Sequence, residues 1–277
     1  MRSLDNELLI EPGGQGKISL KELWLYRELF YFFAWRDIKV RYKQTALGVG
    51  WAILQPLLAA IIFTVFFNHV AKINSGAANI PYPVFAYLGL MYWNAFAAAV
   101  GTISNSLLSN SGVLTKIYFP RLIPPLAATA LSIVDFVFAA VVFFLIMLGY
   151  KVVPGIEGLI LVIPCLALLM VAALGVGIFF AALNVKYRDV RSALPFIIQI
   201  WFFVSPVIYP ISYIPHRFQH FAYLNPAAGA ISTVKEGLFH QAIDWSGFLT
   251  SWVVAIFMLI VGLWYFKRTE KNFVDII

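Results

Sequence analysis

Residues 126–150 read LAATALSIVDFVFAAVVFFLIMLGY, a run of 25 residues in which Asp135 is the one charged side chain. A helix rises about 1.5 Å per residue, so this run is longer than the ~30 Å hydrocarbon core of a bilayer requires. It has no charged stripe of the kind that marks a surface helix. The stretch therefore predicts a transmembrane helix.

Five more apolar runs lie on either side of it, at 47–70, 84–108, 159–183, 193–211 and 248–266. The six runs contain 137 of the 277 residues, and only 12% of the whole chain is charged. Soluble domains carry about a quarter charged residues, so that class is excluded. We expect an all-α polytopic membrane protein with an arm at 1–46, one six-span domain at 47–266 and a tail at 267–277.

The distribution of Lys and Arg indicates which membrane face each connection occupies. Sixteen of the 20 lie in the arm, in the connections after the second and fourth runs, and in the tail. Because cytoplasmic connections carry the excess of positive charge, both termini are predicted to be cytoplasmic. Anionic membrane lipids are the expected partner of the net charge of +7, and nucleic acid is not expected because no soluble domain presents a basic stripe.

The arm before the first run carries a helix of mixed character. Ser19-Leu20-Lys21-Glu22 is a capping box, which predicts that a helix begins at Ser19. Aromatic residues follow, and the helix then becomes basic. Rings and basic side chains beside a span favour the headgroup region, so we expect an amphipathic helix at the cytoplasmic interface. For such a helix, the role of a plain membrane anchor and a mechanical role are about equally well supported.

The connection at 212–246 contains two mostly apolar segments, 218–224 and 227–238, that are too short to cross a bilayer. They predict short re-entrant helices on the external side, and a buried surface loop is the alternative. Asn225 suits an N-cap, with Pro226 at the first helical position. The second helix is therefore expected to begin there.

Signals for bound cofactors are weak. Residues 13–17, GGQGK, resemble a phosphate loop, but Glu11 and Ile18 stand where Gly and Ser or Thr are required. His216 and His220 are spaced for one helical face, yet no third zinc ligand is evident. We therefore predict no ATP, metal or other cofactor in this chain.

Two features inside the spans remain as functional candidates. Asp135 has no evident cationic or catalytic partner, so a polar contact between helices is as plausible as a proton relay, and no catalytic residue is predicted. Phe202, Tyr209 and Tyr213 recur at intervals of seven and four, which predicts an aromatic stripe on one helix. Such rings could stack on sugars in a channel, although core packing explains most of the 46 aromatic residues.

Three motifs resemble the permease subunits of ABC-2 type polysaccharide exporters. They are WRDIKVRYKQT at 35–45, LNVKYRDV at 183–190 and YLNP at 223–226. The resemblance covers nearly the whole chain, from the amphipathic arm to the basic tail. It separates this family from secondary transporters, but it does not separate O-antigen, capsule and teichoic-acid exporters from one another.

The resemblance implies protein partners. A six-span chain of this family forms a homodimeric channel with two copies of a separate ATPase subunit, which bind ATP and Mg. In the family, a short coupling helix between the second and third spans contacts that ATPase, and its counterpart here is 111–120. The residues that this assigns to ATPase coupling are Val113, Leu114, Lys116, Ile117, Tyr118 and, after the fourth span, Arg188 and Asp189.

The resemblance also implies a substrate. Exporters of this family move a lipid-linked polysaccharide across the bacterial cytoplasmic (inner) membrane, normally on undecaprenyl diphosphate, and O-antigen is our first expectation. Basic side chains beside the first span are the local candidates for meeting the diphosphate at the cytoplasmic entrance, namely Arg36, Lys39, Arg41 and Lys43. An ABC-2 permease for drugs or other lipids is an alternative. A membrane-embedded glycosyl or acyl transferase is another, although it would need clustered acids or histidines.

Overall fold

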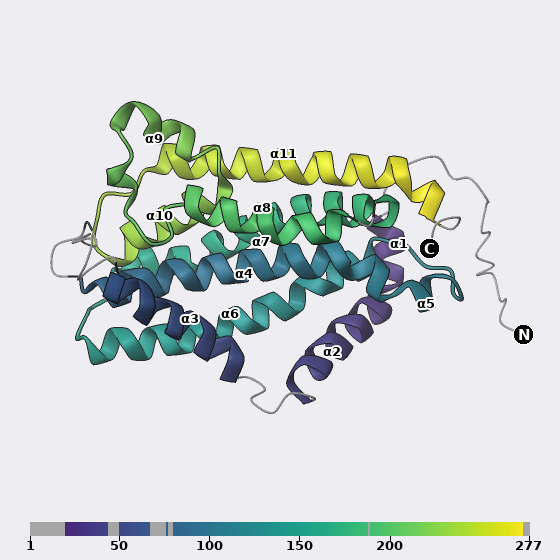
Figure 1. Cartoon of the computed structure of the whole chain (residues 1–277), viewed down its shortest axis with the longest axis horizontal. Helices are drawn as coiled ribbons and strands as arrows, with labels where there is room; N and C mark the ends of the chain where they lie inside the picture. Colours follow the sequence, from purple (N-terminus) through teal and green to yellow (C-terminus); the bar gives the residue numbers. More distant parts are fainter. Residues whose placement is uncertain (1–19, 44–49, 67–75, 77–79, 188, 274–277) are drawn as a thin grey trace, which may run out of the picture.

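The computed structural model describes residues 20–43, 50–66, 76, 80–187 and 189–273, and this part of the chain is helical and without strands (Figure 1). The α-helices are α1 (Leu20–Leu25), α2 (Arg27–Lys43), α3 (Gly50–Phe63), α4 (Tyr82–Ser109), α5 (Ser111–Leu114), α6 (Ile123–Gly149), α7 (Ile156–Lys186), α8 (Val190–Val204), α9 (His216–Ala222), α10 (Pro226–Leu238) and α11 (Trp245–Thr269). Two short 3-10 helices are also present among the described residues: η2 (Ile211–Tyr213) lies between α8 and α9, and η3 (Glu270–Asn272) comes after α11. The prediction of an all-α polytopic membrane protein is confirmed.

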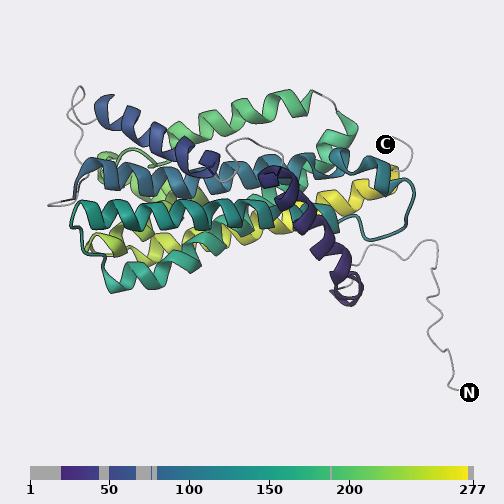
Figure 2. The same ribbon diagram turned by 90° about the horizontal axis from the view of Figure 1, so that it is seen from below.

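Among the described residues, four helices are long and apolar enough to cross a membrane, namely α4, α6, α7 and α11. Their ends lie within three residues of the predicted runs at 84–108, 126–150, 159–183 and 248–266. All four extend along the long axis of the molecule (Figures 1 and 2). The apolar helices α3 and α8 are shorter, so the count of six spans stays a prediction.

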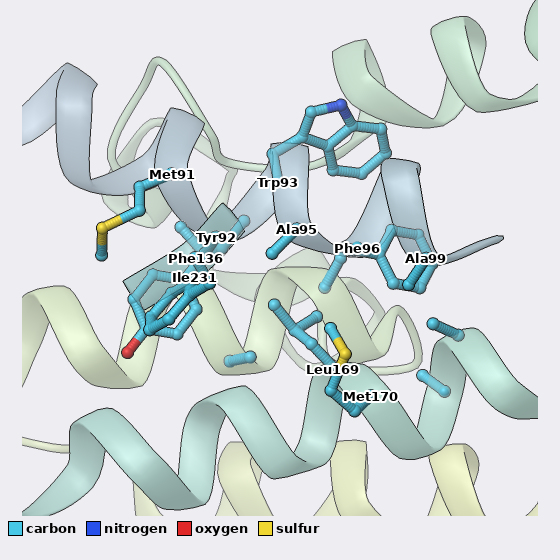
Figure 3. Packing of buried hydrophobic residues seen from close by; sticks show 14 of the residues in the cluster. Met91, Tyr92, Trp93, Ala95, Phe96, Ala99, Phe136, Leu169, Met170 and Ile231 are labelled. Atoms are coloured by element: carbon cyan, nitrogen blue, oxygen red, sulfur yellow. The ribbon is translucent and has the colours of Figure 1, made fainter. Parts of the chain in front are cut away.

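The core lies where α4 packs against α6, α7 and α10. Figure 3 shows Tyr92 of α4 beside Phe136 of α6, with Leu169 and Met170 of α7 in the same cluster. The ring of Tyr92 meets Phe136 of α6 edge to face, with ring centroids 4.9 Å apart. Most of α4 is buried inside the protein, so its apolar composition serves helix packing more than contact with lipid.

Helices α7 and α11 cross at two glycines. A Cβ atom added to Gly262 would lie 2.2 Å from the carbonyl oxygen of Gly175, and one added to Gly175 would lie 2.5 Å from the backbone nitrogen of Leu259. Side chains at these positions would push the helices apart. Small residues at a crossing allow the two backbones to approach closely. Inside a membrane the hydrophobic effect does not drive helices together, so close packing of this kind is what holds them in contact.

Helix α8 ends at Val204, seven residues before the predicted end of the fifth run at Ile211. The prediction of one helix through 193–211 is therefore wrong in its last third. The helix ends here because Pro206 disfavours helical backbone at the residue before it. Ser205 is accordingly extended, with φ −93° and ψ 142°. Its hydroxyl donates to the carbonyl oxygen of Trp201 at 2.8 Å and closes the helix end.

The connection after α8 contains the two predicted short helices, α9 and α10. Asn225 caps α10 as expected, since its side-chain oxygen accepts from the backbone nitrogen of Ala227 at 3.1 Å and Pro226 occupies the first turn. Every residue of α10 is buried, against α7, α11 and α4. This helix therefore returns into the protein and contributes to its core.

The arm forms α1 and α2, separated at Tyr26, and crosses the bundle obliquely (Figure 2). The predicted start at Ser19 lies outside the described residues. Helix α2 packs on α6 and buries Phe33 and Ala34. Tyr31, Phe32 and Trp35 are exposed on its other faces, as an interfacial helix requires.

Candidate functional site

The arm is joined to α6 through Asp135. The Nη2 atom of Arg41 lies 3.0 Å from Oδ2 of Asp135, and the hydroxyl of Tyr42 donates to Oδ1. The Tyr42 ring also meets Phe138 edge to face at 5.8 Å. The interpretation that Asp135 lacks a cationic partner is therefore wrong. Its partner is one of the four residues proposed for the entrance, 94 positions earlier in the chain.

Tyr42 is suited to be a permanent donor in this contact. Burial, and then the hydrogen bond to Asp135, raise the pKa of Tyr42 well above its usual value. The phenol therefore keeps its proton at physiological pH. With Arg41 and Tyr42 both donating, each carboxylate oxygen of Asp135 has a hydrogen-bond partner, which is the condition for holding a charge beside an apolar helix.

A cavity of about 210 Å³ adjoins this contact, between α2, α3, α4 and α6. Its polar lining consists of Arg41, Asp135, Gln55 and Asn94. Asp135 balances the charge of Arg41, so the lining offers hydrogen-bond donors and acceptors without a large net charge. Such a cavity can accept a hydroxyl-bearing or amide group more readily than a free phosphate.

The other three residues proposed for the entrance differ in their surroundings. Arg36 pairs with Asp37 at 2.7 Å, and its guanidinium carbon lies 5.0 Å from the centroid of the Phe33 ring. Lys39 and Lys43 are exposed on α2. The two arginines thus take part in contacts within the chain, while the two lysines present their ammonium groups at the surface.

The predicted coupling stretch at 111–120 divides into an inner and an outer side. Helix α5 covers only its first turn, to Leu114, so the predicted longer helix is absent. Val113 and Leu114 are partly buried against the arm and the start of α6. By contrast, Ile117 and Tyr118 are 61% and 66% exposed, and Lys116 between the two groups is exposed as well. We call Lys116, Ile117 and Tyr118 the outer ridge.

One apolar cluster joins the arm to this stretch. Phe33 of α2 packs against Phe119, with ring centroids 5.7 Å apart, and both side chains are buried. Leu23 and Leu29 of the arm pack on the same cluster, together with Leu114. A displacement of the outer ridge would therefore reach the arm through packed side chains.

The second predicted contact lies in the connection between α7 and α8. Arg188 lies outside the described residues, and Asp189 is exposed immediately before α8. This connection and α5 are at the same end of the bundle, near η3 (Figures 1 and 2). The structure thus brings the two predicted coupling segments to one face of the molecule.

The three predicted path residues do not form one helical stripe, because α8 ends before two of them. Phe202 belongs to α8 and packs against Phe63 and Trp93, at ring-centroid distances of 5.8 and 5.5 Å. Tyr209 lies in the following turn, where its hydroxyl donates to the carbonyl oxygen of Phe203 at 3.2 Å. Tyr213 is in η2 and is half exposed.

Lys235 is one of the four Lys and Arg residues outside the predicted cytoplasmic segments, and it was not predicted to belong to a site. Lys235 lies in α10, is 4% exposed, and donates from Nζ to the carbonyl oxygens of Pro206 and Val207 at 3.0 and 2.8 Å. Its Nζ also lies 3.6 Å from the centroid of the Phe85 ring. The adjacent charged pair Lys235 and Glu236 inside the mostly apolar segment at 227–238 was the available signal.

Comparison with known proteins gives consistent matches. The profile of the ABC-2 type transporter family matches residues 28–239. The O-antigen export system permease protein RfbA of Klebsiella pneumoniae is 28% identical over 244 residues, which cover 87% of this chain and 92% of that protein. A protein of the same name from Myxococcus xanthus is 25% identical over 92% of this chain and 98% of its own length. The polysialic acid transport protein KpsM of Escherichia coli is 22% identical over 85% and 91%.

Proposed function

The chain belongs to the ABC-2 type transporter family, and from this premise we propose that it is the transmembrane permease subunit of a polysaccharide exporter. The observation that carries the proposal is the alignment of relatives named as O-antigen and polysialic acid transport proteins over at least 85% of the chain. The transported molecule is a lipid-linked polysaccharide, O-antigen first among the candidates. The lipid carrier is undecaprenyl diphosphate.

The proposed transporter is a homodimer of this chain with two copies of a separate ATPase subunit, which bind ATP and Mg. The outer ridge supports this assignment because two large apolar side chains, Ile117 and Tyr118, are exposed in a connection too short to be a span. A groove on a soluble partner is the natural place for such side chains. The complex lies in the bacterial cytoplasmic membrane, with both chain termini and the outer ridge on the cytoplasmic side.

In the proposed mechanism, the ATPase moves the outer ridge and the arm follows. Phe33 and Phe119 transmit the movement, since both are buried in the cluster that joins the two segments. Lys39 and Lys43 meet the lipid diphosphate first because they are exposed. Arg36 and Arg41 could join only by leaving their present carboxylate partners.

Reconstitution tests the proposal. The chain is purified alone and together with a candidate ATPase subunit, and both preparations are placed in vesicles loaded with undecaprenyl-diphosphate-linked glycan. We expect no ATP turnover by the chain alone, and ATP-dependent transfer of glycan by the complex. A Lys39→Ser, Lys43→Ser variant should transfer less, while Lys271→Ser, an exposed lysine of η3, serves as the control. ATP turnover by the isolated chain, or transport of drugs or other lipids in place of glycan, would contradict the proposal.

A further inference from the structure

A second cavity lies at the end of the bundle opposite the arm, where α10 meets the turn after α8 (Figure 1). Its volume is about 230 Å³. Ser232, Lys235 and Glu236 of α10 form one wall, Tyr209 belongs to the turn, and Gln241 lies beside them. None of these positions except Tyr209 was predicted to contact a ligand.

The buried ammonium of Lys235 is the central feature of this cavity. Two of its N–H groups reach the carbonyl oxygens of Pro206 and Val207, the face of the Phe85 ring lies 3.6 Å from Nζ, and within the described residues no third oxygen accepts from this amine. No salt bridge to Lys235 forms within the described part of the chain. The backbone makes room for it, because a Cβ atom on Gly89 would lie 3.0 Å from Nζ and 2.1 Å from the oxygen of Val207. The fold thus holds the amine of Lys235 in place at the wall of the cavity.

The same cavity also offers hydrogen-bond acceptors. Oε2 of Glu236 accepts from the backbone nitrogen of Asp244 at 3.1 Å, which leaves other lone pairs on this carboxylate. Gln241 donates from Nε2 to the carbonyl oxygen of Gly76 at 3.0 Å and retains its amide oxygen. Tyr209 adds an aromatic ring, and Ser232 adds a hydroxyl that can both donate and accept.

We propose that this cavity binds a single neutral hexose ring. A sugar hydroxyl both donates and accepts, so it can bond to the side chains of Lys235 and Glu236 together, whereas a phosphate dianion has no proton to donate to Glu236. The apolar face of the ring can lie against Tyr209. The biological meaning of such a site rests on the proposed function, because the hexose would belong to the exported glycan. The binding itself requires no ATPase.

Ligand binding to the purified chain in lipid nanodiscs, without ATPase, tests the proposal. The probes are glucose, galactose, mannose and N-acetylglucosamine, with inorganic phosphate alongside, observed by saturation-transfer NMR. We expect saturable binding of at least one hexose. Lys235→Met should weaken it about tenfold or more, because a charged donor is lost. Lys151→Met, which alters an exposed lysine at the same end of the bundle, is the matched control and should bind normally.

A second variant guards against a folding defect in Lys235→Met. Ser232→Leu leaves the ammonium in place and fills the cavity, so it should also abolish binding. The inference is overturned if no hexose binds the wild-type chain, if phosphate alone binds, or if Ser232→Leu binds hexose as tightly as the wild type. Hexose binding that persists while the complete complex fails to export glycan would count against the proposed function and leave the site intact.

Discussion

Arg41 of the arm and Asp135 of α6 form an ion pair of 3.0 Å that joins a surface helix to the bundle. The side chain of Asp135 is only 13% exposed, and that of Arg41 is 38% exposed. A carboxylate in an apolar helix is costly without a partner, so Asp135 ties the position of the arm to α6. If the arm moves during transport, this pair must open.

A double-mutant cycle measures how strongly the arm is held. Arg41→Gln, Asp135→Asn and the combined variant should give a coupling energy of about 1–3 kcal/mol, as expected for a hydrogen-bonded charge that is largely buried. The Arg36 and Asp37 pair is the control, because both its side chains are about one-third exposed and such pairs contribute at most about 1 kcal/mol. Thermal unfolding in detergent supplies the energies. Equal coupling in the two pairs would contradict the structural role of Asp135.

Mutations can test the role of the outer ridge without disturbing the folded core. Ile117→Asp with Tyr118→Asp should leave thermal unfolding unchanged, since both side chains are exposed, but reduce co-purification with the ATPase. Leu114→Asp should instead destabilise the chain by about 1–3 kcal/mol, because it places a charge against the arm. The matched control is Tyr150→Asp with Val153→Asp, an exposed pair at the opposite end of the bundle. Normal ATPase binding by the Ile117 and Tyr118 variant would remove the ridge from the coupling mechanism.

The sequence predicted the long helices well because the length and composition of an apolar run are local properties. The N-cap at Asn225 was predictable for the same reason, since it depends on two adjacent residues. The end of α8 could have been predicted from Pro206, but the apolar run through Ile211 concealed it. Apolar composition alone does not distinguish a helix from an extended turn buried in the same core.

The long-range contacts could not be predicted in this way. Nothing local to Asp135 indicates that Arg41 is its partner, because the contact depends on how the arm lies across α6. Likewise, the apolar pattern at 111–120 does not show which of its side chains pack against the rest of the protein. The packing of Phe119 on Phe33 decides this, and it turns Val113 and Leu114 inward. The sequence therefore predicts which segments belong to the candidate site, whereas the structure is needed to assign a role to each side chain.

The crossing of α7 and α11 should tolerate no added methyl group. Gly262→Ala brings its Cβ within 2.2 Å of the carbonyl oxygen of Gly175, and this backbone atom can yield only if the helices separate. We expect a loss of about 1–3 kcal/mol, the usual effect of overpacking. Gly101→Ala is the matched control, since a Cβ atom added there would meet no side chain or neighbouring helix of the described residues within 4 Å, and alanine favours the helix by up to ~1 kcal/mol. Thermal unfolding of both variants decides the point, and equal shifts would show that the crossing is looser than described.

The side chain of Asn225 joins the end of α8 to the start of α10 through three hydrogen bonds. Its oxygen accepts from Nε1 of Trp201 at 2.8 Å and from the backbone nitrogen of Ala227 at 3.1 Å, and its nitrogen donates to the hydroxyl of Ser205 at 2.8 Å. These contacts set the course of the turn that carries Tyr209. Asn225→Ala should therefore destabilise the chain by about 2 kcal/mol or more, because it removes an N-cap and leaves the Trp201 N–H without its partner.

Two further variants identify which part of Asn225 matters. Asn225→Asp keeps the acceptor for Trp201 and Ala227 and loses only the donation to Ser205, so its loss of stability should be the smaller one. Asn105→Ala is the matched control, because Asn105 donates within its own helix to Gly101 while its buried side-chain oxygen has no hydrogen-bond partner among the described residues. Its removal should be neutral or stabilising. If thermal unfolding places Asn225→Ala level with Asn105→Ala, the junction between α8 and α10 is held by apolar packing, and the hydrogen bonds of Asn225 are dispensable.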